Sequence, residues 1–220
     1  WFQRRHNWRI RREEILYTTG VVPAISVAIK ALTMPGERVL ILSHDYNCFF
    51  SSIRNNGCEV LESVLRLSHN NCFEVDWTDF EAKCADEKTT VFLLCNPHNP
   101  TGRVWTKEEL MRMNDICLRH DVRVVSDEIH CELIMPGHRF QPFAAVSEQC
   151  RLNSVTLNSP STSFNIAGLQ IANIICSQPE WRRRLNRAIN INEVCDVNPF
   201  GPVALKAAYN ESEAWIDEYS

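Results

Sequence analysis

Short, unbroken apolar runs recur along the chain, and each ends in a cluster of polar or turn-forming residues. The clearest run covers Thr90 to Cys95 and is followed by Asn96 to Gly102, which holds two Asn-Pro dipeptides and a glycine. A run that is apolar at every position is typical of a strand buried on both faces, as in a parallel sheet covered by helices. Similar runs cover 15–19, 38–42, 58–65, 122–126, 153–157 and 171–176. We therefore predict an α/β fold with a mostly parallel sheet of about seven strands and helices on both faces.

Segments with helical spacing separate these runs. The best defined covers 106–120, where Leu110, Met113 and Ile116 fall on one face. Thr106 with Glu109 three residues later predicts a capping box at its start. Further helical segments are expected at 24–32, 47–56, 76–84, 140–150 with its connector, 181–192 and 202–220.

Charge and cysteine usage exclude several classes of partner. The net charge of -4 gives no reason to expect nucleic acid, and no run approaches the roughly 18 apolar residues that span a bilayer. None of the ten cysteines are spaced as Cys-x-x-Cys, so we expect no metal site and reduced cysteines in a cytoplasmic protein. The stretch 1–12 lacks the apolar core of a signal peptide and the chain lacks an initiator Met, so an internal fragment is expected.

Several strand ends carry groups with a chemical use. A carboxylate such as Asp127, at the end of a buried strand, needs a positive partner. The turn Gly20 to Pro23 enters a helix and offers free backbone N–H groups to an anion. The hydroxyl-rich turn 159–163 suits an anion as well. On residues alone, Tyr46 is interpreted as a core or rim tyrosine and His130 as a structural histidine.

Three strings resemble signature segments of fold-type I pyridoxal-phosphate (PLP) enzymes in the class I/II aminotransferase superfamily. They are Asn-Pro-His-Asn-Pro-Thr-Gly at 96–102, Ser-Asp-Glu-Ile-His at 126–130, and the turn 159–169. Within that superfamily the match is to the cystathionine β-lyase-like branch, whose third pattern reads Ser-x-Ser-Lys-x-Phe-Asn. Here the position of the Schiff-base lysine holds Thr162.

The resemblance implies a role for each matching residue. Tyr46 would stack on the pyridine ring, Asn99 would donate to the phenolic oxygen, and Asp127 would pair with the ring nitrogen. His130 falls near the phenolic oxygen. The phosphate would be held by the main chain of Val21 and Val22 and by the hydroxyls of Ser159 and Ser161.

The resemblance also implies a domain organisation. Residues 1–195 correspond to the large, PLP-binding domain, and 196–220 to the start of a helix leading to a small domain that the chain lacks. A homodimer that acts on a small amino-acid substrate is expected from the family.

Three functions follow from this resemblance. The first is a PLP-dependent carbon–sulfur β-lyase that releases thiol, pyruvate and ammonia, impaired here because Thr162 replaces the lysine. The second is an aminotransferase, against which Gln170 counts, because many aminotransferases carry a phosphate-binding arginine there. The third is a non-catalytic module that binds PLP or an amino acid, which Thr162 favours.

Overall fold

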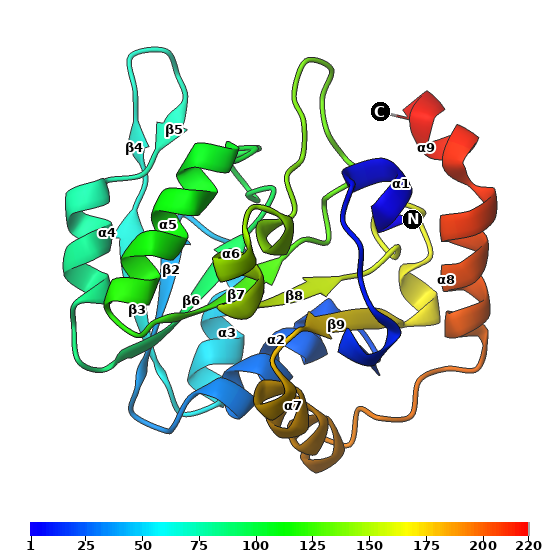
Figure 1. Cartoon of the computed structure of the whole chain (residues 1–220), viewed down its shortest axis with the longest axis horizontal. Helices are drawn as coiled ribbons and strands as arrows, with labels where there is room; N and C mark the ends of the chain where they lie inside the picture. Colours follow the sequence, from blue (N-terminus) through cyan, green and yellow to red (C-terminus); the bar gives the residue numbers. More distant parts are fainter. Residues whose placement is uncertain (220) are drawn as a thin grey trace.

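The computed structural model describes residues 1–219, and its centre is a seven-stranded sheet in the order β1-β9-β8-β7-β6-β2-β3 (Figure 1). β9 alone runs opposite to the other six strands. The predicted mostly parallel α/β sheet is therefore confirmed. The strands are β1 Ile15–Thr18, β2 Arg38–Ser43, β3 Glu59–Val64, β6 Thr89–Cys95, β7 Arg123–Asp127, β8 Ser154–Asn158 and β9 Ala172–Cys176.

The central strand β6 explains why the sequence shows unbroken apolar runs. Val91 and Leu93 join the core on one face of the sheet, while Phe92 and Leu94 join the core on the other. Helices cover both faces (Figure 1). One core includes residues of α2 (Val21–Leu32), α3 (Asn47–Asn55) and α7 (Pro179–Ile191), and the other includes residues of α4 (Trp77–Cys84), α5 (Lys107–Arg119) and α6 (Glu148–Leu152).

Helix α5 begins as its sequence predicts. Glu109 N–H donates to the Thr106 hydroxyl at 3.1 Å, and Thr106 N–H donates to the Glu109 carboxylate at 2.8 Å, which completes the capping box. The apolar face of the helix is buried. Local polar residues therefore fix the start of this helix, and its apolar stripe fixes its orientation.

The structure differs from the sequence prediction in its less regular parts. The single helix expected over 202–220 is wrong, because α8 (Phe200–Glu211) ends at Ser212 and α9 (Glu213–Tyr219) follows. The segment 140–150 holds a 3-10 turn, η2 (Phe143–Ala145), and α6 begins only after the Ser147 cap. Short elements also escaped prediction: α1 (Phe2–His6), η1 (Arg12–Glu14), η3 (Ala167–Leu169) and the hairpin of β4 (Arg66–Leu67) with β5 (Phe73–Glu74).

The two ends of the described chain lie together (Figure 1). Trp1 stacks on Tyr209 of α8 with ring centroids 5.5 Å apart, and Phe164 stacks on Trp215 of α9 at 5.8 Å. An ion pair joins Arg5 Nη1 to Asp217 Oδ1 at 2.6 Å. Aromatic packing thus ties both ends to the turn that carries Thr162.

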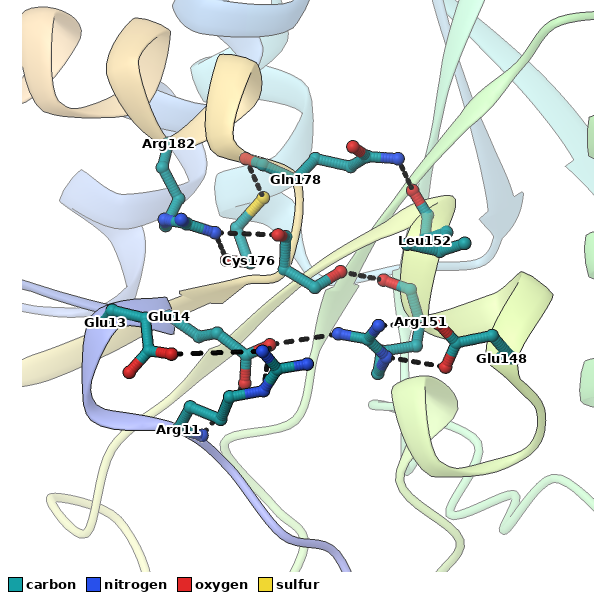
Figure 2. Close-up of polar contacts among 10 residues, drawn as sticks. Arg11, Glu13, Glu14, Glu148, Arg151, Leu152, Cys176, Gln178 and Arg182 are labelled. Carbon is teal, nitrogen blue, oxygen red and sulfur yellow. Dashed lines mark hydrogen bonds and ion pairs between the residues drawn. The ribbon is translucent and has the colours of Figure 1, made fainter.

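A polar network lies at the end of the sheet where β1 and β8 begin (Figure 2). Arg151 contacts Glu14 at 3.0 Å and Glu148 at 2.6 Å. Arg182 donates to the carbonyl oxygens of Cys176 and Ser177 at the end of β9. The network leaves the carboxyl ends of the parallel strands free for other use. No helix among residues 1–219 combines the length and the apolarity needed to cross a bilayer.

The capping box gives a direct test of local helix stability. Replacing Thr106 by alanine removes the acceptor of Glu109 N–H, and we expect the free energy of unfolding to fall by about 1 kcal/mol. Urea denaturation measures this change. Thr106→Ser keeps the hydroxyl and should retain most of the stability. Equal midpoints for Thr106→Ala and the parent chain would contradict the assignment.

Candidate functional site

The carboxyl ends of the parallel strands surround a cavity of about 430 Å³. Loops that follow β1, β2, β6, β7 and β8 all contribute to its wall. In an open α/β sheet this is the edge at which ligands bind. The lining residues are Thr19, Gly20, Val21, Val22, Pro23, Tyr46, Cys95, Asn99, Asp127, Ile129, His130, Ser161, Thr162, Ala167 and Gln170.

The N-terminus of α2 forms one wall of this cavity. The first intrahelical hydrogen bond runs from Ala24 N–H to Gly20 O at 3.0 Å, so the N–H groups of Val21 and Val22 precede the helical ladder. Pro23 has no N–H to satisfy, as is usual in a first helical turn. The dipole of this 12-residue helix makes the wall suitable for an anion.

The hydroxyl-rich turn after β8 faces the helix terminus across the cavity. Ser161 and Thr162 line it, but Ser159 does not. The Ser159 hydroxyl donates to Ile171 O at 2.6 Å and accepts from Ser161 N–H at 3.0 Å. Ser159 thus holds the turn in shape from behind, and its predicted contact with a phosphate stays a prediction.

Asp127 lies in the wall of the cavity at the end of β7. Its side chain is buried, and it accepts one hydrogen bond from Ile129 N–H at 3.1 Å. Burial raises the pKa of Asp127 to about 7, against the effect of that bond. This carboxyl group is poised to ionise when a cation enters.

A second acid with a buried side chain, Asp45, directly precedes Tyr46 of the cavity wall. Its Oδ1 accepts from Tyr46 N–H at 2.7 Å, while its Oδ2 has no hydrogen-bond partner. His98 Nε2 is 3.8 Å from that oxygen. Burial raises the pKa of Asp45 to about 8, and the negative charge of Asp127 adds to the rise. Asp45 is therefore a neutral acid at neutral pH.

Asn99, Tyr46 and His130 come from three different loops. The turn that carries Asn99 is closed by His98 N–H to Arg103 O and by Gly102 N–H to His98 O, both at 2.8 Å. A bond to Cys48 raises the pKa of Tyr46 to about 12, so its phenol stays protonated. Burial lowers the pKa of His130, which favours the neutral imidazole.

The cavity has no amine donor from a side chain. Its described lining includes no lysine, and the position expected for one presents the Thr162 hydroxyl. The lysines of the chain are 30, 83, 88, 107 and 206. A covalent imine to this cavity therefore has no partner among the lining residues.

One other group of polar side chains has the residue types of a metal site. In residues 1–219, His6, Cys131 and Glu132 place potential ligand atoms within 4.8 Å of one another. Glu132 Oε1 already accepts from His6 Nε2 at 2.6 Å and from Trp1 Nε1 at 2.7 Å. Arg5 lies 3.8 Å from the other oxygen. These contacts describe a hydrogen-bonded junction that joins α1 to the segment after β7.

Sequence reasoning missed Asp45, Thr19, Cys95 and Ile129. The rule that selects Asp127, an acid at the end of a buried strand, selects Asp45 equally well. Glu128, which follows Asp127 in the sequence, is fully buried outside the cavity lining and accepts from Ser126 Oγ and Phe143 N–H, both at 2.9 Å.

The chain is similar to known proteins in both sequence and structure. The family profile described as aminotransferase class I and II matches residues 1–220. The chain belongs to the class I and II aminotransferase family. It is 40% identical to cystathionine β-lyase PatB of Bacillus subtilis, over 99% of this chain and 56% of that protein. Protein MalY of Escherichia coli is 33% identical over 99% of this chain and 55% of its own length.

Among solved structures, cystalysin from Treponema denticola, which contains a pyridoxal 5'-phosphate cofactor, matches with a TM-score of 0.96 and 36% identity. The match covers 99% of this chain and 55% of cystalysin. The chain spans about half the length of the curated relatives it matches most fully. The predicted boundary between a large domain, 1–195, and the start of a connecting helix, 196–220, stays a prediction.

The buried acid Asp45 should make stability depend on pH. Its folded-state pKa of about 8 lies above its ordinary value of 3.8, so its contribution is fully present below pH 4 and is lost as the pH rises toward 8. The Asp45→Asn variant has no ionisable group at this position, so it does not lose this stability as the pH rises. We expect the variant to gain stability over the parent chain, by about 2–5 kcal/mol at pH 8 and by much less at pH 5.

Denaturation by urea at several pH values measures that difference. The matched control is Asp115→Asn, because Asp115 is exposed on α5. Its stability difference from the parent chain should not change with pH. A constant difference for Asp45→Asn would show that Asp45 is ionised throughout.

Proposed function

We propose that this chain is the PLP-binding part of a carbon–sulfur β-lyase, which releases thiol, pyruvate and ammonia from sulfur-containing amino acids. The observation that supports it most is that Tyr46, Asn99, Asp127 and Ser161, from four loops, line one cavity. The similarity to cystathionine β-lyases favours this chemistry over transamination. Gln170 on the cavity wall, rather than an arginine, agrees with that choice.

The residues present fit the cofactor without a covalent link. In this proposal the N-terminus of α2 and the Ser161 hydroxyl would hold the phosphate, because main-chain donors and the helix dipole favour an anion there. Tyr46 would stack on the ring, and the Asn99 amide would donate to the phenolic oxygen. When bound, PLP supplies an electron sink for the carbanion formed on the amino acid.

Asp127 is the residue that prepares the site for this chemistry. Since burial raises its pKa to about 7, a large share of Asp127 carries a proton at neutral pH. Asp127 would give that proton to an entering pyridine nitrogen, and its carboxylate would then pair with the cation. The ion pair relieves the cost of a buried charge for both partners.

Thr162 limits what the chain can catalyse. A hydroxyl forms no imine and is a poor base at neutral pH, and loss of a general base alone costs roughly 10²–10⁴-fold in rate. We therefore propose that the cofactor is held non-covalently and that turnover is slow. The second candidate, a non-catalytic module that binds PLP or its amino-acid adducts, is favoured by the same residue.

The proposal includes a homodimer in a reducing cytoplasm that acts on a small amino-acid substrate. The ten cysteines are all free, and all but Cys48, Cys72 and Cys195 are buried. Buried thiols of this kind act as small apolar side chains and need no oxidant.

Non-covalent binding can be measured directly. We expect PLP to bind the chain, to change absorbance on binding, and to be removed by gel filtration even after borohydride treatment. In Thr162→Lys, borohydride should fix the cofactor to the protein, because a primary amine then faces the cavity. The five native lysines are the internal control. Labelling of a lysine in the parent chain would contradict the proposal.

The reaction class is tested in the Thr162→Lys variant with cystathionine as substrate. Release of pyruvate and thiol supports a lyase, whereas transfer of the amino group to an added keto acid supports an aminotransferase. Retained PLP binding without either product supports the non-catalytic module.

A cation added to the cavity wall at the proposed phosphate position should raise the affinity for PLP. Gln170→Arg places a cation beside the proposed phosphate position, and we expect PLP affinity to rise about tenfold or more, since a hydrogen bond to a charged group contributes roughly 1.5–3 kcal/mol. Absorbance titration measures the dissociation constant. Gln141→Arg, a matched change outside the cavity lining, should leave it unaltered. An unchanged affinity in Gln170→Arg would place the phosphate elsewhere.

A further inference from the structure

A polar cavity lies between α1, the segment after β7 and α9. Its volume is about 490 Å³, and it shares no lining residue with the proposed PLP cavity. His6, Cys131 and Glu132 line it together. Each offers one ligand atom for a metal, and the three atoms lie within 4.8 Å of one another. No other such group occurs among residues 1–219.

The three side chains are shielded from water and held by their neighbours. The side chains of His6 and Glu132 are 9% and 3% exposed, and Cys131 is buried. The His6 ring packs edge-on against Phe140, with ring centroids 5.1 Å apart. Trp1 Nε1 donates to Glu132 Oε1 at 2.7 Å. Neighbours that fix the orientation of the ligand groups are a regular feature of metal sites.

The chemistry of the three ligand atoms suits zinc. An imidazole nitrogen, a thiolate sulfur and a carboxylate oxygen are the ligand types that Zn²⁺ takes, whereas Mg²⁺ and Ca²⁺ prefer oxygen alone. A zinc ion held by three side chains keeps its fourth position for water. The cavity beside the three residues leaves room for that water and gives the ion a path of entry.

The contact between His6 and Glu132 marks where the ion fits. His6 Nε2 lies 2.6 Å from Glu132 Oε1, and Cys131 Sγ lies 3.6 Å from the same oxygen. Bonds of about 2.0 Å to nitrogen and oxygen and about 2.3 Å to sulfur separate tetrahedral ligand atoms by roughly 3–4 Å. The nitrogen and the oxygen therefore need to move apart by only about 1 Å.

The protons and charges balance when zinc enters. The metal replaces the hydrogen between His6 Nε2 and Glu132 Oε1, the imidazole keeps its proton on Nδ1, and the Cys131 thiol releases its proton to solvent. Zn²⁺, one thiolate and one carboxylate then form a neutral unit. Arg5, 3.8 Å from the other oxygen of Glu132, keeps Asp217 as a partner at 2.6 Å.

We propose that His6, Cys131 and Glu132 form a zinc site that ties α1 to the segment after β7. This inference is independent of the proposed PLP chemistry. The cysteine spacing predicted no metal site because it considers ligands that are close in sequence. His6 and Glu132 are 126 positions apart, so only the fold brings them together.

Cobalt and zinc test the site in the reduced, metal-free 220-residue chain. We expect Co²⁺ to give the near-ultraviolet absorption of a thiolate–Co²⁺ bond and the visible bands of a tetrahedral ion, saturating at about one ion per chain. Zn²⁺ should displace it. X-ray absorption of the zinc complex should then show one sulfur at about 2.3 Å and lighter ligands at about 2.0–2.1 Å.

Substitution of the ligands should remove these signals. In Cys131→Ser the thiolate absorption should vanish. In His6→Gln the affinity for Zn²⁺ should fall at least about tenfold, since loss of even an outer-shell partner costs 10–100-fold. The matched control is Cys176→Ser, because Cys176 is also buried but lies in β9; it should bind both metals as the parent chain does. Circular dichroism checks the fold of each variant.

The outcomes decide for or against the site. Absence of the thiolate absorption, more than one sulfur around zinc, or undiminished binding in folded Cys131→Ser or His6→Gln would overturn it. Loss of the signal in folded Cys176→Ser would do the same, since another thiol would then hold the metal. If Cys131→Ser does not fold, His6→Gln and the X-ray absorption spectrum give the answer. Titration with PLP tests the proposed function separately.

Discussion

An acid buried at the end of a central strand constrains this molecule more than any other group. The pKa of Asp127 responds to burial and to one backbone N–H, with no cation among the residues that shift it. A carboxyl group in that position is stable as a neutral acid or beside a cation brought from outside. The parallel arrangement of β2, β6, β7 and β8 then places four polar loops around it. The buried acid and the four loops around it together form a site suited to a cationic ring that carries an anionic group.

The rest of the fold leaves the carboxyl ends of the parallel strands accessible. Both faces are closed by apolar helices, and the far edge by the Arg151 network (Figure 2). The turn with Thr162 is held from behind by Ser159 and from the side by the Phe164 and Trp215 stack. Rigid support of this kind fixes the position of side chains that contact a ligand.

The absence of a lysine and the presence of Asp45 bear on different parts of the proposed chemistry. Thr162 removes the covalent link and the mobile base, whereas the phosphate wall, the ring partners and Asp127 do not depend on it. Asp45 adds a second buried acid next to Tyr46, and burial, with a smaller contribution from the charge of Asp127, raises its pKa so that it stays neutral. This is why we propose a site that holds a ligand and turns it over slowly.

Local patterns were sufficient for the regular elements. The apolar run 90–95 predicted β6, and Thr106 with Glu109 predicted the start of α5, because each depends on neighbours in sequence. The strings at 96–102, 126–130 and 159–169 also indicated the family by themselves. No proline or glycine marks the break between α8 and α9 at Ser212, so the local sequence did not predict it, although α1 contacts both helices.

The sequence by itself determined which residue types stand at the strand ends, and it supports the prediction that Thr162 takes the lysine position. Only the tertiary structure decided that Ser159 lies behind the turn, that Asp45 is buried next to His98, and that Asn99 and His130 line one cavity. The reason is physical: a strand end is a local property, but burial, charge state and shared walls arise only when segments distant in sequence pack together.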